Sequence, residues 1–189
     1  MKVASYTDRK YFGILMSPVA ECSLADFMTK TEKDDQRRQT LSTFFGCLAS
    51  ALEYLHGRWI RHRDIKPDNI LVKKDQVYVT DFGISLDWQS LSGSTTEEAG
   101  KTFNYCAPEV AEPGQKRNTK SDIWSLGCVF LEMLVVRQGI AVEDLKVAFN
   151  QASETRAFHC NTNTIFYWIN HKFQKPRPKA VGPTVLEFT

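Results

Sequence analysis

Mostly apolar residues form two short segments near the start of the chain, residues 3–6 and 11–16. Both segments are rich in β-branched and aromatic residues, and the polar residues 7–10 separate them. This pattern predicts a β-hairpin. The strand pattern ends at Ser17-Pro18, because proline cannot donate to a strand ladder. We expect a linker there between strands and helices.

Apolar residues return at helical spacing farther along the chain. From residue 36 onward they recur every three or four positions, at Leu41, Phe44, Phe45, Leu48, Leu52 and Leu55. This periodicity predicts a helix that stops near Gly57. A second helix is expected to begin near Ser121-Asp122, and its wide apolar face predicts that it is buried. Two weaker helical stretches follow at residues 142–152 and 164–172.

The segments between these helices have different patterns. Two apolar runs, residues 70–72 and 77–79, flank a polar turn and predict a second hairpin. Residues 85–101 are dominated by Ser, Thr, Gly and Glu without periodicity, which predicts a mobile loop. A Pro-rich basic segment at 174–179 follows the last predicted helix.

Composition narrows the class of protein. The chain has 189 residues, of which 42% are apolar, and its 24 basic and 22 acidic side chains leave a net charge of +2. This balance argues against a dedicated nucleic-acid or membrane-surface partner, and one globular domain is expected. The most apolar stretch, residues 128–136, is too short for a membrane span.

Cysteine usage and the first residues indicate a compartment. The five cysteines are odd in number and widely spaced, and they form no CxxC pair. A disulfide framework and a structural zinc site are therefore not expected. Residues 1–10 have no apolar signal-peptide core. We expect an intracellular protein, cytoplasmic or nuclear.

Three motifs carry the chemistry: HRDIKPDN at residues 62–69, DFG at 81–83 and APE at 107–109. Each motif alone is a weak signal, but their order, their spacing and the hairpin between the first two are specific. Together they resemble the protein kinase family. The resemblance covers nearly the whole chain and is weakest in the last third.

The resemblance implies an α+β, protein-kinase-like fold with a mainly α-helical large lobe and a remnant β-hairpin of the small lobe. Residues 1–16 are expected to form the small-lobe strands, 17–22 the hinge and 23–180 the large lobe. Residues 181–189 would be a C-terminal tail.

The resemblance also assigns catalytic roles. Asp64 would accept or orient the proton of the substrate hydroxyl, and Lys66 would place its ammonium near the transferred phosphate. Asn69 and Asp81 would supply the oxygen ligands that Mg²⁺ between ATP phosphates requires. Lys66, with Thr102 placed three residues before Tyr105, resembles the serine/threonine branch. Lys101 departs from the glycine that many relatives carry there, which leaves peptide preference open.

The adenine side of the nucleotide is assigned by the same resemblance. Met16 falls at the gatekeeper position, the backbone groups of Ser17 and Val19 would bind the adenine edge, and Leu71 would pack beneath the ring. The alternative is that Met16 and Leu71 are simply core residues.

Further residues are expected to support the HRDIKPDN segment. His62 resembles a member of an internal stack with Phe82, a structural role, and Asp122 resembles the helix aspartate that holds the backbone of this segment. Glu109 would pair with Arg177, or else Arg177 belongs to a solvated tail.

Regulation is expected at the loop between the DFG and APE motifs. Arg63 resembles the arginine that meets a phosphorylated or acidic loop, although it would alternatively be an ordinary exposed arginine. The candidate phosphate acceptors are Ser92, Ser94, Thr95, Thr96 and Thr102. Thr95, Thr96 and Thr102 are the regulatory positions that we predict, against the alternative of a merely flexible polar loop.

The family pattern also requires a Gly-rich loop, a strand lysine and a helix glutamate, which are not found. Only Lys2 and Lys10 precede the predicted hinge, and neither has a VAIK-like context. We therefore expect a fragment of an active enzyme, a truncated protein with little activity, or a chain that a partner or missing segment completes.

Two functions remain in view. The first is a serine/threonine protein kinase that uses ATP and Mg²⁺ on protein substrates, with neither nucleic acid nor membrane as a partner. The second is a kinase-like interaction module without catalysis.

Overall fold

The structure of the chain is a computed structural model that describes residues 2–8, 10–17, 19–31, 34–87, 103–112 and 118–173. Its helices are α1 (Leu24–Thr31), α2 (Asp35–Gly57), α3 (Pro108–Ala111), α4 (Thr119–Arg137), α5 (Val142–Ser153) and α6 (Thr162–His171). Its strands are β1 (Lys2–Thr7), β2 (Phe12–Met16), β3 (Cys22–Ser23), β4 (Ile60–Arg61), β5 (Ile70–Lys73), β6 (Gln76–Val79) and β7 (Leu86–Asp87). Short 3₁₀ turns are η1 (Pro67–Asn69), η2 (Phe103–Tyr105) and η3 (Phe158–Cys160).

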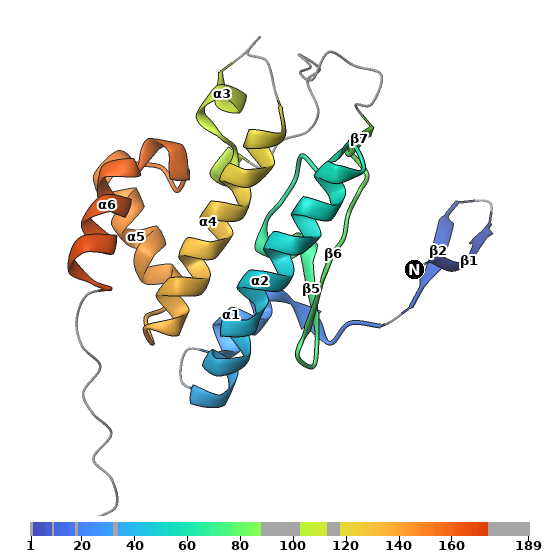
Figure 1. Cartoon of the computed structure of the whole chain (residues 1–189), viewed down its shortest axis with the longest axis horizontal. Helices are drawn as coiled ribbons and strands as arrows, with labels where there is room; N and C mark the ends of the chain where they lie inside the picture. The colour runs from blue at the N-terminus through green and yellow to red at the C-terminus, as the bar shows by residue number, and fades with distance from the viewer. Residues whose placement is uncertain are drawn as a thin grey trace, which may run out of the picture.

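The main body is a row of packed elements around two long helices. Figure 1 shows α2 and α4 side by side, with β5 and β6 beyond α2 and with α5 and α6 beyond α4. The β1–β2 hairpin stands apart from this body at the N-terminal end (Figure 1). This arrangement is α+β, with a mainly helical body and a small hairpin, as the sequence predicts.

Both predicted hairpins are confirmed. Strands β1 and β2 pair antiparallel from Lys2↔Met16 to Thr7↔Phe12. Their turn is fixed by Asp8, whose Oδ1 accepts from the backbone N–H groups of residues 10 and 11, each at 2.7 Å. In the main body, β3, β5 and β6 form an antiparallel sheet in that order.

One expectation about the loop at residues 85–101 is wrong at its start. Residues 86–87 form β7, which pairs antiparallel with β4 through Ile60↔Asp87 and Arg61↔Leu86. A strand of two residues is too short to show a period, so the sequence pattern could not reveal it. Residues 88–101 lie outside the described residues.

The helices begin and end close to the predicted positions. Helix α2 is capped by Asp34, whose carboxylate accepts from the N–H of Arg37 at 3.1 Å, and it includes Gly57 as its last residue. Helix α4 begins two residues earlier than expected, because Asn118 caps it by accepting from the N–H of Lys120 at 2.8 Å. Both caps satisfy backbone donors that the first turn leaves unpaired.

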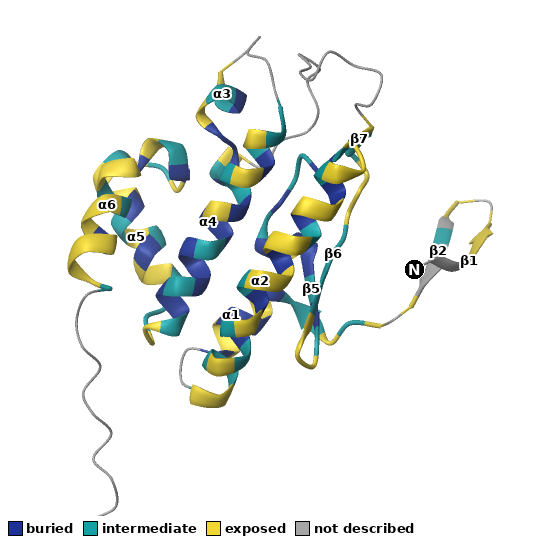
Figure 2. Cartoon of the chain, viewed as in Figure 1, coloured by how far each residue is buried: buried dark blue, intermediate teal, exposed yellow. Residues whose placement is uncertain are grey.

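The hydrophobic core lies between the helices and the three-stranded sheet. Figure 2 shows buried residues along the length of α4 and on one side of α2. The prediction that α4 is a buried helix is therefore confirmed, although Ile123 on its predicted apolar face is 57% exposed. Two carboxylates of α4, Asp122 and Glu132, are as buried as the core.

Within the described ranges, no single helix has the length and hydropathy of a membrane span. Helices α4 and α5, which meet at a bend of 120°, pass that test only as a pair, on length and composition. The tail at 174–189 lies outside the described residues, and the predicted domain boundaries stay a prediction.

Candidate active site

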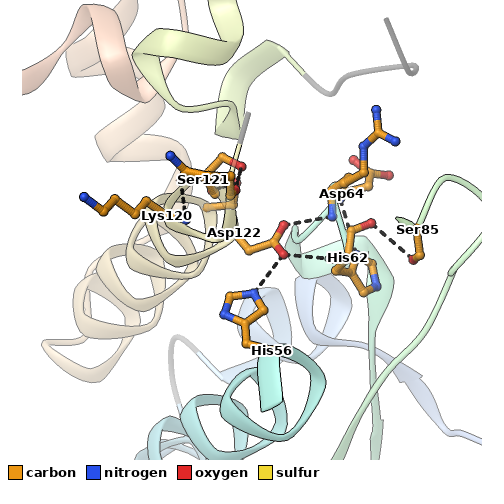
Figure 3. Close-up of polar contacts among 10 residues, drawn as sticks. His56, His62, Asp64, Ser85, Lys120, Ser121 and Asp122 are labelled. Carbon is orange, nitrogen blue, oxygen red and sulfur yellow. Dashed lines mark hydrogen bonds and ion pairs between the residues drawn. The ribbon is translucent and has the colours of Figure 1, made fainter. Parts of the chain in front are cut away.

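Residues 62–69, here called the HRD loop, are held in place from helix α4. Asp122, which is 2% exposed, accepts from the backbone N–H of His62 at 2.9 Å and from that of Arg63 at 2.8 Å. Its Oδ2 also lies 3.0 Å from Nε2 of His56 at the end of α2 (Figure 3). The predicted role of Asp122 in holding the HRD loop backbone is confirmed.

The backbone is strained at Arg63, one of the two residues whose N–H groups Asp122 accepts from. Arg63 has φ of 73°, the left-handed region that a residue with a Cβ adopts at a cost. The hydrogen bond from its N–H to Asp122 compensates part of that cost. Backbone strain of this kind concentrates at functional sites. Here it lies directly before Asp64 in the chain.

Asp64, Lys66 and Asn69 come together on the HRD loop. Nζ of Lys66 and Nδ2 of Asn69 each lie 2.8 Å from Oδ2 of Asp64. Nδ2 of Asn69 also donates to the backbone carbonyl of Asp64 at 2.9 Å. Asp64 and Lys66 are partly buried, with side chains 13% and 21% exposed, so the carboxylate is held in a fixed direction.

His62 is a structural residue of the loop. Its Nδ1 accepts from the N–H of Asp64 at 3.3 Å, and its Nε2 lies 2.9 Å from the carbonyl oxygen of Thr80. These two contacts correspond to the tautomer in which Nδ1 accepts and Nε2 donates. The expected contact with Phe82 is confirmed at 4.9 Å between ring centroids.

Asp81 is placed by its neighbours on both sides. Thr80 donates its N–H to the carbonyl of Asn69 at 2.9 Å, and Phe82 stacks on His62. Asp81 itself has φ of 63°, so the left-handed turn falls on the aspartate rather than on Gly83. A Cβ at Gly83 would lie 3.3 Å from Oδ1 of Asp81, so glycine is favoured there because it leaves room for the carboxylate.

The segment from η2 to α3 lies beside the HRD loop. A cavity of about 20 Å³, enough for one water molecule, is bounded by Asp64, Tyr105, Ala107 and Ser125. Ser125 on α4 donates to the carbonyl of Tyr105 at 2.9 Å. These contacts fix the backbone of residues 105–107 next to Asp64.

A buried carboxylate anchors the same segment. The hydroxyl of Tyr105 donates to both carboxylate oxygens of Glu132, at 2.9 and 3.1 Å, and Nζ of Lys146 lies 3.6 Å from Oε1. Burial raises the pKa of Glu132 above its usual range, while Lys146 and Tyr105 oppose that rise. Burial likewise raises the pKa of Tyr105, so its hydroxyl stays protonated and donates.

A comparison with models of protein families identifies the family of the chain. The model of the protein kinase domain matches residues 2–189. The chain belongs to the protein kinase family. Its HRD loop, its DFG segment and the anchoring aspartate on α4 are therefore read as kinase elements.

Curated relatives are kinases of several groups. Mitogen-activated protein kinase kinase 2 of Arabidopsis thaliana is 38% identical over 130 residues, 68% of this chain and 35% of the relative. Serine/threonine-protein kinase nekl-2 of Caenorhabditis elegans is 38% identical over 120 residues, 60% of this chain and 33% of the relative. Mitogen-activated protein kinase kinase kinase 15 of Mus musculus is 33% identical over 138 residues, 71% of this chain and 10% of the relative.

The aligned region thus spans 35% or less of the length of each of these three relatives. What the whole relatives do is accordingly carried to this chain only as a proposal.

The residues predicted on the adenine side lie before and within the sheet. Ser17 follows β2, and Val19 is 78% exposed in the connection to β3. Leu71 is half-buried on β5, where it pairs with Ser23. Met16 is the last residue of β2.

The predicted regulatory residues fall in different parts of the chain. Arg63 is half-buried on the HRD loop. Thr95, Thr96 and Thr102 lie outside the described residues, as does Arg177, the expected partner of Glu109.

Three residues of the site were missed from the sequence: His56, Lys146 and Glu132. His56 lies in the last turn of the first predicted helix, but no spacing rule connects it to Asp122. Glu132 is the one charged residue in the apolar stretch 128–136, and that isolation is the sequence signal of a buried polar role.

Proposed function

We propose that this chain carries the machinery of a serine/threonine protein kinase, which transfers the γ-phosphoryl group of ATP to a protein hydroxyl. The observation that supports the proposal is the arrangement on the HRD loop, where Lys66 and Asn69 both lie 2.8 Å from Oδ2 of Asp64. Serine/threonine specificity is proposed from Lys66 in the HRD loop and from relatives such as nekl-2.

In the proposed reaction, the substrate hydroxyl oxygen attacks the γ-phosphorus, and the bond from that phosphorus to the bridging oxygen breaks. Asp64 takes the hydroxyl proton, and ADP leaves with the bridging oxygen. Lys66 places an ammonium group beside Asp64, where the negative charge of the transferred group is neutralised. Asp122 contributes by holding the backbone that sets the direction of Asp64.

The donors on this loop fit Mg²⁺. Asn69 donates through Nδ2 to both the carbonyl and the carboxylate of Asp64, so these two contacts do not use its amide oxygen. That oxygen and the exposed carboxylate of Asp81 are the hard ligands that Mg²⁺ prefers. When bound with ATP, the ion would neutralise phosphate charge.

The remaining assignments complete the proposal. Met16, Ser17, Val19 and Leu71 would form the adenine side of the nucleotide site, by family resemblance. Phosphate on Thr95, Thr96 or Thr102 would bind Arg63 and order the substrate segment.

The test is phosphate transfer from radiolabelled ATP to a generic basic protein, followed by identification of the phosphorylated amino acid. We expect phosphoserine or phosphothreonine, and a loss of about a hundredfold or more in the Asp64→Asn variant. Asp75→Asn is the matched control, because Asp75 is exposed in the turn between β5 and β6. Equal transfer by Asp64→Asn and the unaltered chain would refute the assignment of Asp64.

A second candidate is an interaction module that keeps the fold without catalysis. It is favoured by one observation: the 189 residues contain neither a Gly-rich loop nor a lysine in a VAIK-like context. Background transfer by the unaltered chain, the Asp64→Asn variant and the Asp75→Asn variant alike would support this candidate for the chain of 189 residues.

A further inference from the structure

A cavity of about 290 Å³ lies away from the HRD loop, where four elements meet. It is bounded by Cys22 on β3, Phe27 and Lys30 on α1, Arg37 on α2 and Lys74 in the turn between β5 and β6. Asn69 and Thr80 meet at the open end of the β5–β6 hairpin, and Lys74 is at its closed end. The cavity is therefore separate from the candidate active site.

The rim of this cavity, here called the basic cavity, is cationic. Lys30, Arg37 and Lys74 face a single lining carboxylate, Glu21. Among the described residues, Lys30 and Lys74 make neither an ion pair nor a hydrogen bond through their ammonium groups, whereas Nε of Arg37 lies 3.3 Å from Asp34. Within the described part of the chain, these two ammonium groups are therefore available to an external anion.

The floor of the basic cavity is apolar. Phe27 is 8% exposed, and the guanidinium of Arg37 lies 5.8 Å from the centre of its ring. Burial raises the pKa of the Cys22 thiol, so Cys22 stays uncharged at neutral pH. A ligand that fits both surfaces carries negative charge at the rim and an apolar group at the floor.

We propose that the basic cavity is a docking site for an acidic segment of a protein partner, in which carboxylates flank an aliphatic side chain. A volume of about 290 Å³ accommodates one or two side chains rather than a folded surface. A nucleic acid fits less well, because the one aromatic ring of the cavity is covered and offers no face for base stacking. The docking site requires no phosphoryl transfer and stands independently of the proposed function.

The first test uses the full chain and a fluorescein-labelled peptide in which glutamates flank a leucine, followed by fluorescence anisotropy. We expect binding that weakens as salt rises, and a loss of about tenfold in affinity in the Lys30→Glu/Lys74→Glu variant. The matched control is Lys10→Glu/Lys172→Glu, which changes net charge equally at two exposed lysines elsewhere. A control loss as large as that of the cavity variant would overturn the proposal.

The second measurement locates the peptide without a substitution. Alkylation of each cysteine in the full chain is followed by mass spectrometry with and without the peptide. The peptide should slow alkylation of Cys22 and leave the exposed Cys47 and Cys160 unchanged. Equal rates at Cys22 would overturn the docking site, as would tighter binding of a single-stranded oligonucleotide or of the charge-reversed lysine peptide.

Discussion

Glu132 is a carboxylate buried among the core residues of the described chain. It is 1% exposed, and burial raises its pKa, so the folded chain holds its proton more tightly than the unfolded chain does. The contribution of Glu132 to the free energy of unfolding is fully present below its ordinary pKa of 4.5. This contribution is lost as pH rises through the raised pKa. We predict that Glu132→Gln removes this pH-dependent loss of stability, which amounts to about 1.4 kcal/mol for each pKa unit of the shift.

Urea unfolding of both proteins between about pH 5 and about pH 8 measures this difference. The stability of the unaltered chain should fall relative to Glu132→Gln across this range. Glu143→Gln is the control, because Glu143 is 59% exposed and its pair with Arg156 lies at the surface. A pH-independent difference between Glu132→Gln and the unaltered chain would show that Glu132 titrates normally.

At this scale, the sequence predicts the site only where local motifs set it. Asp64, Lys66 and Asn69 lie within six residues, so one loop suffices to gather them. The contact of Glu132 with Tyr105 and Lys146 joins three distant segments, and no local pattern encodes it.

Helix α4 acts on the HRD loop through one carboxylate. Removing it in Asp122→Ala would leave the N–H groups of His62 and Arg63 without their acceptor in a buried place. We predict a loss of about 3 kcal/mol in the free energy of unfolding, measured by urea denaturation. The left-handed turn at Arg63 would lose its support as well.

The control for the Asp122→Ala variant is Asp144→Ala, which removes an aspartate from the first turn of another helix, α5. Asp144 is exposed, so its loss should cost less than about 1 kcal/mol through the helix dipole. Losses of similar size in the two variants would contradict the anchoring role of Asp122.

The elements themselves were predictable in proportion to their length. Helices α2 and α4 span 23 and 19 residues and show several periods of apolar spacing. Strands β4 and β7 have two residues each, and their pairing depends on chain segments 25 residues apart. Their existence follows from tertiary contacts that the sequence pattern does not contain.

Across the described parts of the molecule, the β1–β2 and β5–β6 hairpins lie in different surroundings. Strands β5 and β6 pack against α1 and α2, and Ile70 and Val72 are buried there. The β1–β2 hairpin stands apart from the body (Figure 1), with Tyr6 and Tyr11 58% and 70% exposed. The sequence predicts each hairpin from two short apolar segments around a polar turn. It does not predict their different surroundings, because the packing partners come from distant segments.

A two-stranded hairpin without packing is only marginally stable in water. We therefore predict that amide hydrogens of β1 and β2 exchange at least about tenfold faster than those of β5 and β6. Hydrogen exchange with mass spectrometry compares the two hairpins within one sample, so solvent, temperature and labelling time are matched. Equal protection would mean that a surface covers β1–β2 in solution, and loss of that protection on dilution of the chain would show that the surface belongs to a second copy.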